Sequence, residues 1–334
     1  MSDRNLSALA EALRAAQSVC LVSHEFPDGD TIGSALALCI GLERLGKTVE
    51  HFCVHKVPDN LMELPGADRV RPAESLRGDE RFDLLLCVDI ADERRAGTLD
   101  GKPVMEMLRA RCARTAQVDH HGTNPGYCEV NSVDGGAAAA GLLVRELLDV
   151  LGVALDTDLA ACLYTAIATD TGNFSHGNTS AEVFRAAASL MDAGLELTRW
   201  NRRLFVERAM PKQLLIARAM NSLRYLCGGR LGVITLSRQD FAEAKATAEH
   251  ADDIVNIALD TEGTVMALLA REEASGGIKC SLRALAPLRV DEIARSFGGG
   301  GHAQASGCTV AGELGEVTER VTAAMEKELK KQNV

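Results

Sequence analysis

The sequence predicts an α/β protein with an N-terminal, doubly wound and mostly parallel sheet and a smaller C-terminal α/β domain joined to it by a helical connector. Three observations predict this. Short apolar segments alternate with amphipathic ones over the first half of the chain, a helical and arginine-rich stretch occupies 180–226, and short apolar segments then return. We therefore expect domains at 1–195 and 229–334, with the connector at 196–228.

The first domain begins with a strand, a turn and a helix. Residues 18–24, SVCLVSH, form an apolar run of strand length, and TIGSALALCIGLERLGK has the spacing of an amphipathic helix that ends at Gly46. Further strands are expected at 48–54, 82–89 and 114–121, and helices in GGAAAAGLLVRELLDVLG and DLAACLYTAIATD. Because strands and helices alternate, we expect a parallel sheet, and such sheets bind ligands at the carboxyl ends of their strands.

The second domain is expected to contain strands in LGVITLS, TVMALLARE and GIKCSLRAL, with helices between and after them. This order of elements predicts a second sheet, separate from the first.

Composition limits the class of protein. The chain has 334 residues, of which 46% are hydrophobic, enough for two cores. Its net charge of −11 makes it a poor candidate for binding long duplex nucleic acid through a basic surface, unless bound cations change the local field. It carries ten cysteines without a C-x-x-C pair, no signal-peptide pattern and no membrane-spanning apolar run. We expect a cytoplasmic protein without membrane attachment.

Acidic residues and histidines gather where the predicted strands and one helix end. They lie in HEFPDGD, VDIAD, VDHHGTN and TDTGNF, and they are His24, Asp28, Asp30, Asp89, Asp119, His120, His121 and Asp170. Carboxylates and imidazoles without thiolates suit Mn²⁺, Mg²⁺ or a similar divalent ion. Two ions about 3.5–4 Å apart need a bridging group and separate ligands on each side, and Asp89 is placed to bridge.

Each segment alone also has an ordinary structural interpretation. A D-x-D pair before a helix is usually a helix cap, and Asp30 could serve only that purpose. Asp119 could cap a turn, and Asp170 could begin one with Gly172. All of these clusters would have to be coincidences at once, so we favour the metal site.

In this order, HEFPDGDTIGS, VDIAD, VDHHGTN and TDTGNF resemble the four motifs of the DHH phosphoesterase family. The C-terminal SLRAL…DEIARSFGGGGHAQASG resembles the DHH-associated domain that follows the catalytic domain in one branch. The chain looks most like the stand-alone oligoribonucleases (nanoRNases) and 3′-phosphoadenosine 5′-phosphate (pAp) phosphatases. The resemblance implies a hydrolase with two divalent ions, Mn²⁺ as the first choice and Mg²⁺ or Co²⁺ as alternatives.

The resemblance also implies a role for each residue of the motifs. The first ion would be held by His24 and Asp28, the second by Asp30, His120 and Asp170, and both by the shared Asp89. His121 would face the scissile phosphate, and Asp119 would orient the imidazoles. Together with Asp89, these last two residues form the expected catalytic set.

The segment FGGGGHAQASG, residues 297–307, has four consecutive glycines before a histidine. Glycines let backbone amides approach an anion closely, but a glycine run is equally typical of a hinge or a tight turn. The resemblance implies that this loop binds a nucleotide phosphate together with an upstream arginine. The expected substrate-binding residues are Arg283, Gly299, Gly300, Gly301 and His302.

Other functions stay open at this point. Within hydrolases the alternatives are a phosphodiesterase for cyclic dinucleotides or pGpG and an inorganic pyrophosphatase, although GGGGHAQASG argues against the latter. A catalytically inactive nucleotide-binding regulator would not need the intact ligand set, and an NAD-dependent dehydrogenase would need a glycine-rich first turn. With 4% aromatic residues, the chain favours short substrates over long polymers. The expected partners are short single-stranded RNA, dinucleotides or pAp, and a homodimer is allowed.

Overall fold

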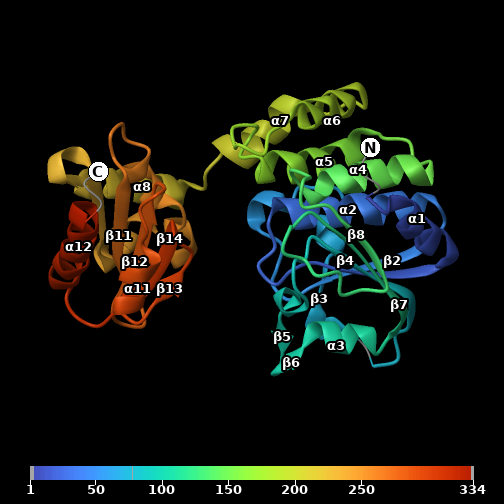
Figure 1. Ribbon diagram of the computed structural model, residues 1–334, viewed down its shortest axis with the longest axis horizontal. Helices are drawn as coiled ribbons and strands as arrows, with labels where there is room; N and C mark the ends of the chain where they lie inside the picture. Colours follow the sequence, from blue (N-terminus) through green and yellow to red (C-terminus); the bar gives the residue numbers. More distant parts are fainter. Residues whose placement is uncertain (1–3, 77, 332–334) are drawn as a thin grey trace. The chain divides into compact units, whose positions relative to one another are not determined.

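The computed structural model describes residues 4–76 and 78–331 and divides the chain into two compact units, Met1–Glu207 and Arg208–Val334 (Figure 1). The division falls inside the predicted connector. Helix α7 (Leu197–Asn201) belongs to the first unit, whereas α8 (Met210–Ser222) belongs to the second and packs on its sheet. None of the described helices is both long and apolar enough to cross a membrane.

The first unit contains a six-stranded sheet in the order β3-β2-β1-β4-β7-β8, and every neighbouring pair is parallel. The strands are β1 (Ser18–Val22), β2 (Thr48–Cys53), β3 (Arg71–Pro72), β4 (Phe82–Val88), β7 (Cys112–Asp119) and β8 (Val130–Val133), and β5 (Thr98–Leu99) and β6 (Lys102–Pro103) form a separate ribbon. The predicted fold class is confirmed. The strand order reverses between β1 and β4, and the carboxyl end of such a switch point is where doubly wound sheets bind ligands.

Helices cover both faces of this sheet (Figure 1). They are α1 (Leu6–Ala15), α2 (Gly29–Arg44), α4 (Ala140–Leu151), α5 (Thr157–Asp170) and α6 (Ala181–Asp192) on one side and α3 (Val104–Arg109) on the other. Helix α2 packs directly against α5. A Cβ atom at Gly33 would lie 2.4 Å from the carbonyl oxygen of Cys162, so the two helices can approach this closely only because residue 33 is glycine.

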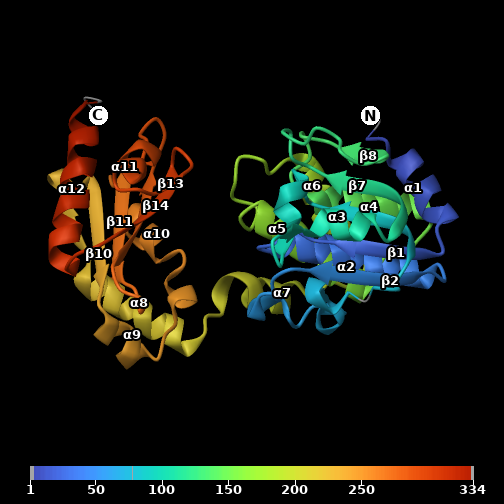
Figure 2. The same cartoon turned by 90° about the horizontal axis from the view of Figure 1, so that it is seen from below.

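The second unit has a mixed six-stranded sheet in the order β13-β14-β12-β11-β10-β9 (Figure 2). Its strands are β9 (Arg224–Leu226), β10 (Leu231–Leu236), β11 (Met266–Glu272), β12 (Ile278–Ala284), β13 (Gly300–Gly301) and β14 (Ala305–Val310). Its other helices are α9 (Arg238–Ala244), α10 (Ile254–Leu259), α11 (Asp291–Ser296) and α12 (Leu314–Lys331). Side chains alternate along the strands: Val233 packs in the core with α12, and Ile234 packs in the core with α8 and α10.

Candidate metal centre

The loop between β1 and α2 crosses the carboxyl edge of the first sheet and carries His24 and Asp28. Asp28 is the N-cap of α2, and its Oδ1 accepts the backbone amides of Asp30 and Thr31 at 3.0 and 3.1 Å. Its Oδ2 faces Nε2 of His24 at 3.5 Å. One carboxylate oxygen of Asp28 therefore caps the helix, and the other is available to bind a metal ion. Asp30 is not the cap, because it lies inside α2.

Asp89 follows β4, on the other side of the switch point, and is buried. Its Oδ2 lies 3.8 Å from Nε2 of His24, and its Oδ1 lies 3.5 Å from Nε2 of His120. The two carboxylate oxygens thus face two different imidazoles. A carboxylate that bridges two ions has this arrangement.

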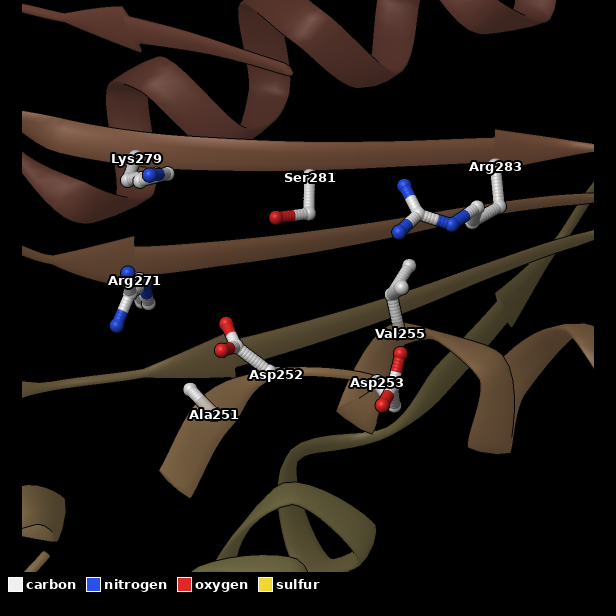
Figure 3. Close-up of a pocket in the computed structure, with 8 residues that line it drawn as sticks. All are labelled: Ala251, Asp252, Asp253, Val255, Arg271, Lys279, Ser281 and Arg283. Atoms are coloured by element: carbon white, nitrogen blue, oxygen red, sulfur yellow. The ribbon is translucent and has the colours of Figure 1, made fainter. Parts of the chain in front are cut away.

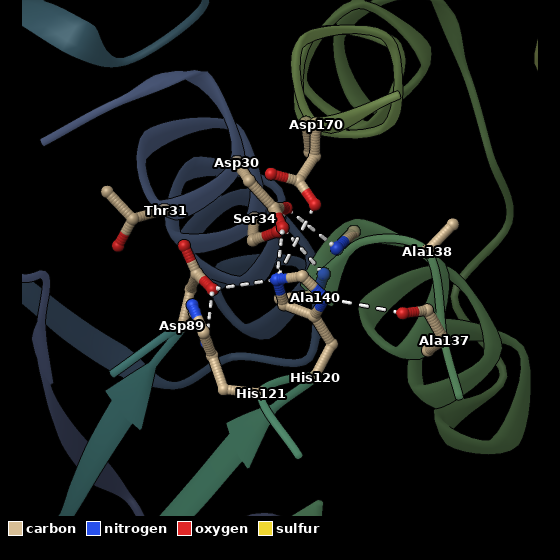
Figure 4. Close-up of polar contacts among 12 residues, drawn as sticks. Asp30, Thr31, Ser34, Asp89, His120, His121, Ala137, Ala138, Ala140 and Asp170 are labelled. Atoms are coloured by element: carbon tan, nitrogen blue, oxygen red, sulfur yellow. Dashed lines mark hydrogen bonds and ion pairs between the residues drawn. The ribbon is translucent and has the colours of Figure 1, made fainter. Parts of the chain in front are cut away.

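The second group of side chains surrounds His120 (Figure 4). Nε2 of His120 lies 3.6 Å from both Oδ2 of Asp30 and Oδ2 of Asp170, the last residue of α5. The Asp30 carboxylate is buried and accepts the backbone amides of Ala140 and Gly141 at 2.6 and 2.9 Å. The first turn of α4 therefore holds this carboxylate in place.

Within residues 4–76 and 78–331, three groups of side chains offer ligand atoms that lie within 4.8 Å of one another. Asp89 belongs to two of the groups, and so does His120. The groups are His24, Asp28 and Asp89; Asp30, His120 and Asp170; and Asp89, His120 and His121. Nitrogen–oxygen separations of 3.5–3.8 Å are too long for hydrogen bonds, but they suit atoms around one ion with bonds of about 2.0–2.6 Å.

Two atoms of this centre lack a hydrogen-bond partner among the described residues. Nε2 of His24 and Oδ1 of Asp89 are buried and make no hydrogen bond to any described residue. Leaving such groups unsatisfied is costly, and bound cations would satisfy both. The donor set, carboxylate and imidazole, fits two divalent ions of the Mn²⁺ or Mg²⁺ type.

Without a bound cation, the negative charges of these buried carboxylates are only partly compensated. Burial and the neighbouring carboxylates raise the pKa of Asp30 and of Asp89. Burial acts to lower the pKa of His120, but its contact with Asp89 and the charges of Asp30 and Asp170 outweigh burial and raise this pKa to about 10. Without a cation, the cluster therefore tends to retain protons, and a bound cation would replace them.

His121 lies beside the cluster, and a hydrogen bond to Asp119 fixes its orientation. Its Nδ1 donates to Oδ1 of the buried Asp119 at 2.8 Å, and Asn124 donates to the other oxygen of Asp119 at 2.6 Å. Burial acts to raise the pKa of Asp119, but these two hydrogen bonds lower it overall, so the carboxylate stays charged. Of the two neighbouring histidines, His121 is the one that Asp119 hydrogen-bonds, whereas Nδ1 of His120 donates to the carbonyl of Ala137 at 3.3 Å.

The structure adds residues that the sequence had not singled out. The Arg95 guanidinium lies 3.4 Å from Nε2 of His121, and Asn124 holds Asp119. Both stand within or just after the quoted motifs, in VDIADERR and VDHHGTN. That proximity was the only signal for them in the sequence.

Among the predicted substrate residues of the second unit, Arg283 lies on β12 and Gly300 and Gly301 form β13, and β14 runs between these two strands. Arg283 of β12 pairs with Ala305 of β14, and Gly301 of β13 pairs with Ser306. Arg283 lines a cavity of about 380 Å³ that the glycine loop and His302 do not line (Figure 3). The residues around it are Ala251, Asp252, Asp253, Val255, Arg271, Lys279, Ser281 and Arg283.

The glycine run forms a tight hairpin with β14. A Cβ atom at Gly299 would lie 2.1 Å from the carbonyl oxygen of Gly307, and one at Gly301 would lie 2.6 Å from that of Ala305. At Gly300 a Cβ atom would meet open space, and this residue is exposed. Packing thus explains the glycines at 299 and 301, and it does not explain the one at 300.

These features define a class of protein: a doubly wound sheet with paired His–Asp groups at its switch point, followed by a separate mixed-sheet unit. Residues 18–167 match the N-terminal domain of the DHH family, and residues 228–331 match the DHHA1 domain. The chain belongs to the DHH family, and the predicted resemblance is confirmed. It is therefore a phosphoesterase, which is a hydrolase.

Two relatives and one solved structure show which proteins the chain is similar to over most of its length. Over 324 residues, which are 96% of this chain and 93% of the relative, the sequence is 34% identical to the bifunctional oligoribonuclease and PAP phosphatase NrnA of Thermus thermophilus. Cyclic-di-AMP phosphodiesterase GdpP of Geobacillus thermodenitrificans is 25% identical over 93% of this chain and 47% of its own. The crystal structure of an exopolyphosphatase-related protein from Bacteroides fragilis has the same fold, with a TM-score of 0.85 at 23% identity over 99% of this chain and 96% of that one.

Proposed function

We propose that this phosphoesterase hydrolyses short oligoribonucleotides to mononucleotides and pAp to AMP and phosphate, with two divalent ions, Mn²⁺ as the first choice. The observation that carries the metal chemistry is the Asp89 carboxylate, whose two oxygens face His24 and His120. The substrate class is supported by the similarity to a bifunctional oligoribonuclease and PAP phosphatase over nearly the whole chain.

In this mechanism, His24, Asp28 and Asp89 would hold one ion, and Asp30, His120, Asp170 and Asp89 would hold the other. When bound, the ions supply a deprotonated water as the nucleophile and a Lewis acid at the phosphoryl oxygen. The hydrogen bonds from the backbone amides of Ala140 and Gly141 fix the oxygens of Asp30 before the substrate arrives.

The protein's own groups act on the phosphate and on the leaving oxygen. Attack by water breaks one phosphorus–oxygen ester bond, and the leaving oxygen takes up a proton. We assign the donation of that proton to Nε2 of His121, because Asp119 holds Nδ1 and leaves Nε2 on the other side of the ring. Arg95 supplies positive charge beside His121 for a non-bridging phosphate oxygen.

A phosphate of the nucleotide binds to the second unit. Arg283, Lys279 and Ser281 share one face of β12, and Gly300 exposes its backbone beside His302. Only a few cationic contacts are needed for a short substrate, which agrees with the negative net charge.

A second candidate function is hydrolysis of cyclic di-AMP or of linear products such as pGpG. The similarity to a cyclic-di-AMP phosphodiesterase over 93% of this chain favours it. The same metal chemistry would serve both functions, and the substrate decides between them.

A substrate panel tests the proposal. It contains pApA, pGpG, a short RNA, pAp, cyclic di-AMP and pyrophosphate, each with Mn²⁺ and with EDTA. We expect Mn²⁺-dependent hydrolysis of pApA and pAp, and its loss in Asp89→Ala. The matched control is Asp83→Asn at the opposite end of β4, where Asp83 accepts the amides of Gln17 and Ser18. Near-normal turnover by Asp89→Ala would contradict the proposal.

A further inference from the structure

Phe26 lies in the loop between His24 and Asp28, the two residues assigned to the first ion alone, and 71% of it is exposed. Single exposed apolar side chains are common on protein surfaces, so exposure alone has no functional meaning. Two further observations distinguish this phenyl ring: it stacks on a second ring, and it stands beside the metal centre.

The second ring is the imidazole of His55. The two ring centroids are 4.6 Å apart, and the ring planes differ by 22°. Nδ1 of His55 donates a hydrogen bond to the backbone carbonyl of Glu25, the residue before Phe26. This bond holds the imidazole to the loop, so the imidazole supports one face of the phenyl ring and keeps the ring in a preformed position.

The pair stands at the same edge of the sheet as the metal centre. Phe26 follows β1, His55 follows β2, and these strands are parallel neighbours. Phe26 is two residues from His24 and two from Asp28, which limits the Cα separations to about 7 Å. A nucleotide spans a comparable distance between its phosphate and its base.

We infer that the Phe26–His55 pair is a stacking surface for the nucleobase next to the cleaved phosphate. This inference rests on the proposed function, because it needs a substrate with a base. Every nucleobase has a π face, so such a surface binds all four bases with little preference. His55 covers one face of the Phe26 ring, and the remaining exposed surface is available to the base.

The experiment measures kcat and KM with Mn²⁺ for pApA and for two analogues of pApA, each lacking one of the two bases. The variants are Phe26→Ala, Phe26→Trp and His55→Ala. The matched control is Phe184→Ala on α6, because Phe184 is 57% exposed and stacks on Phe174 at the same 22° angle.

We expect Phe26→Ala to lower kcat/KM for pApA about ten- to hundredfold, mainly through KM. His55→Ala should give a smaller loss, Phe26→Trp should retain the wild-type value, and Phe184→Ala should not change it. On the analogue that lacks the stacked base, Phe26→Ala should cause no further loss, because the two deletions remove one interaction.

An unchanged kcat/KM for pApA in Phe26→Ala would overturn the stacking surface and leave the proposed function intact. Equal losses on pApA and on both analogues would also overturn it, because they would show a disturbed loop at His24 and Asp28. If the unaltered protein with Mn²⁺ does not cleave pApA, the proposed function fails and the stacking surface fails with it.

Discussion

The two units build their polar sites in different ways. In the first unit, the residues of the metal centre come from loops, from the start of α2 and from the end of α5, at the carboxyl edge of a parallel sheet, and they are mostly carboxylates. In the second unit, Lys279, Ser281 and Arg283 alternate along one strand and share one face of a mixed sheet. The first site attracts cations, and the second has three cationic side chains against two carboxylates.

This difference implies different consequences of mutation. The metal centre of the first unit depends on buried groups that hydrogen bonds keep in place. Asp30, for example, accepts two backbone amides from the first turn of α4. The polar site of the second unit consists of side chains that extend one by one from a strand into a cavity (Figure 3). We therefore expect losses of turnover in the first unit and losses of affinity in the second.

The largest expected effect is that of Asp30→Ala. The substitution removes one ligand of the second ion, so bound Mn²⁺ should fall from two ions per chain to one, and turnover of pApA should fall about a thousandfold. Metal titration by calorimetry and steady-state kinetics measure the two changes. Asp83→Asn is again the control. Two bound ions in Asp30→Ala would show that Asp30 is structural only.

Arg283→Ala should have a smaller effect and of a different kind. Loss of one phosphate contact should raise KM for pAp about tenfold, leave kcat nearly unchanged and make binding less dependent on salt. Arg320→Ala, an exposed arginine of α12 that pairs with Glu316, is the matched control. A lowered kcat with unchanged KM would remove the distinction between the two sites.

The first site could be predicted from the sequence because its residues follow regular elements. A parallel sheet brings all carboxyl ends to one edge, so His24, Asp89 and His120 had to meet there whatever the lengths of their loops. Arg95 and His55 could not be predicted, since their positions depend on the paths of irregular loops.

The glycine run shows a second limit of prediction. The sequence allowed both a phosphate loop and a tight turn, and only the approach of β13 to β14 separates the glycines required by packing from Gly300. Periodicity predicts strands, but it does not predict how closely two backbones pass.

The difference between Gly301, which packing requires, and Gly300 can be tested with one substitution at each position. Gly301→Ala should destabilise the protein by about 1–3 kcal/mol, because its Cβ atom would lie 2.6 Å from the Ala305 carbonyl oxygen at a φ of 140°. Gly300→Ala should unfold like the wild type and raise KM for pAp. Urea unfolding and kinetics measure both. Equal loss of stability in the two variants would contradict the assignment of Gly300 to the substrate.

The smallest expected effect is a loss of stability of the first unit in acid, caused by His51. Burial lowers the pKa of His51 in the first unit to about 4, and its Nε2 lies 2.8 Å from Oγ of Ser23. Because the folded state resists the proton more than the unfolded state does, His51 contributes fully above the unfolded pKa of about 6.5 and less as the pH falls. Between pH 7 and 5.5 the loss should be about 1 kcal/mol, and urea unfolding followed at Trp200, a buried residue of the first unit, measures it. His51→Gln should remove this pH dependence. An unchanged dependence in that variant would contradict this assignment and would leave His51 as a neutral packing residue beside Ser23.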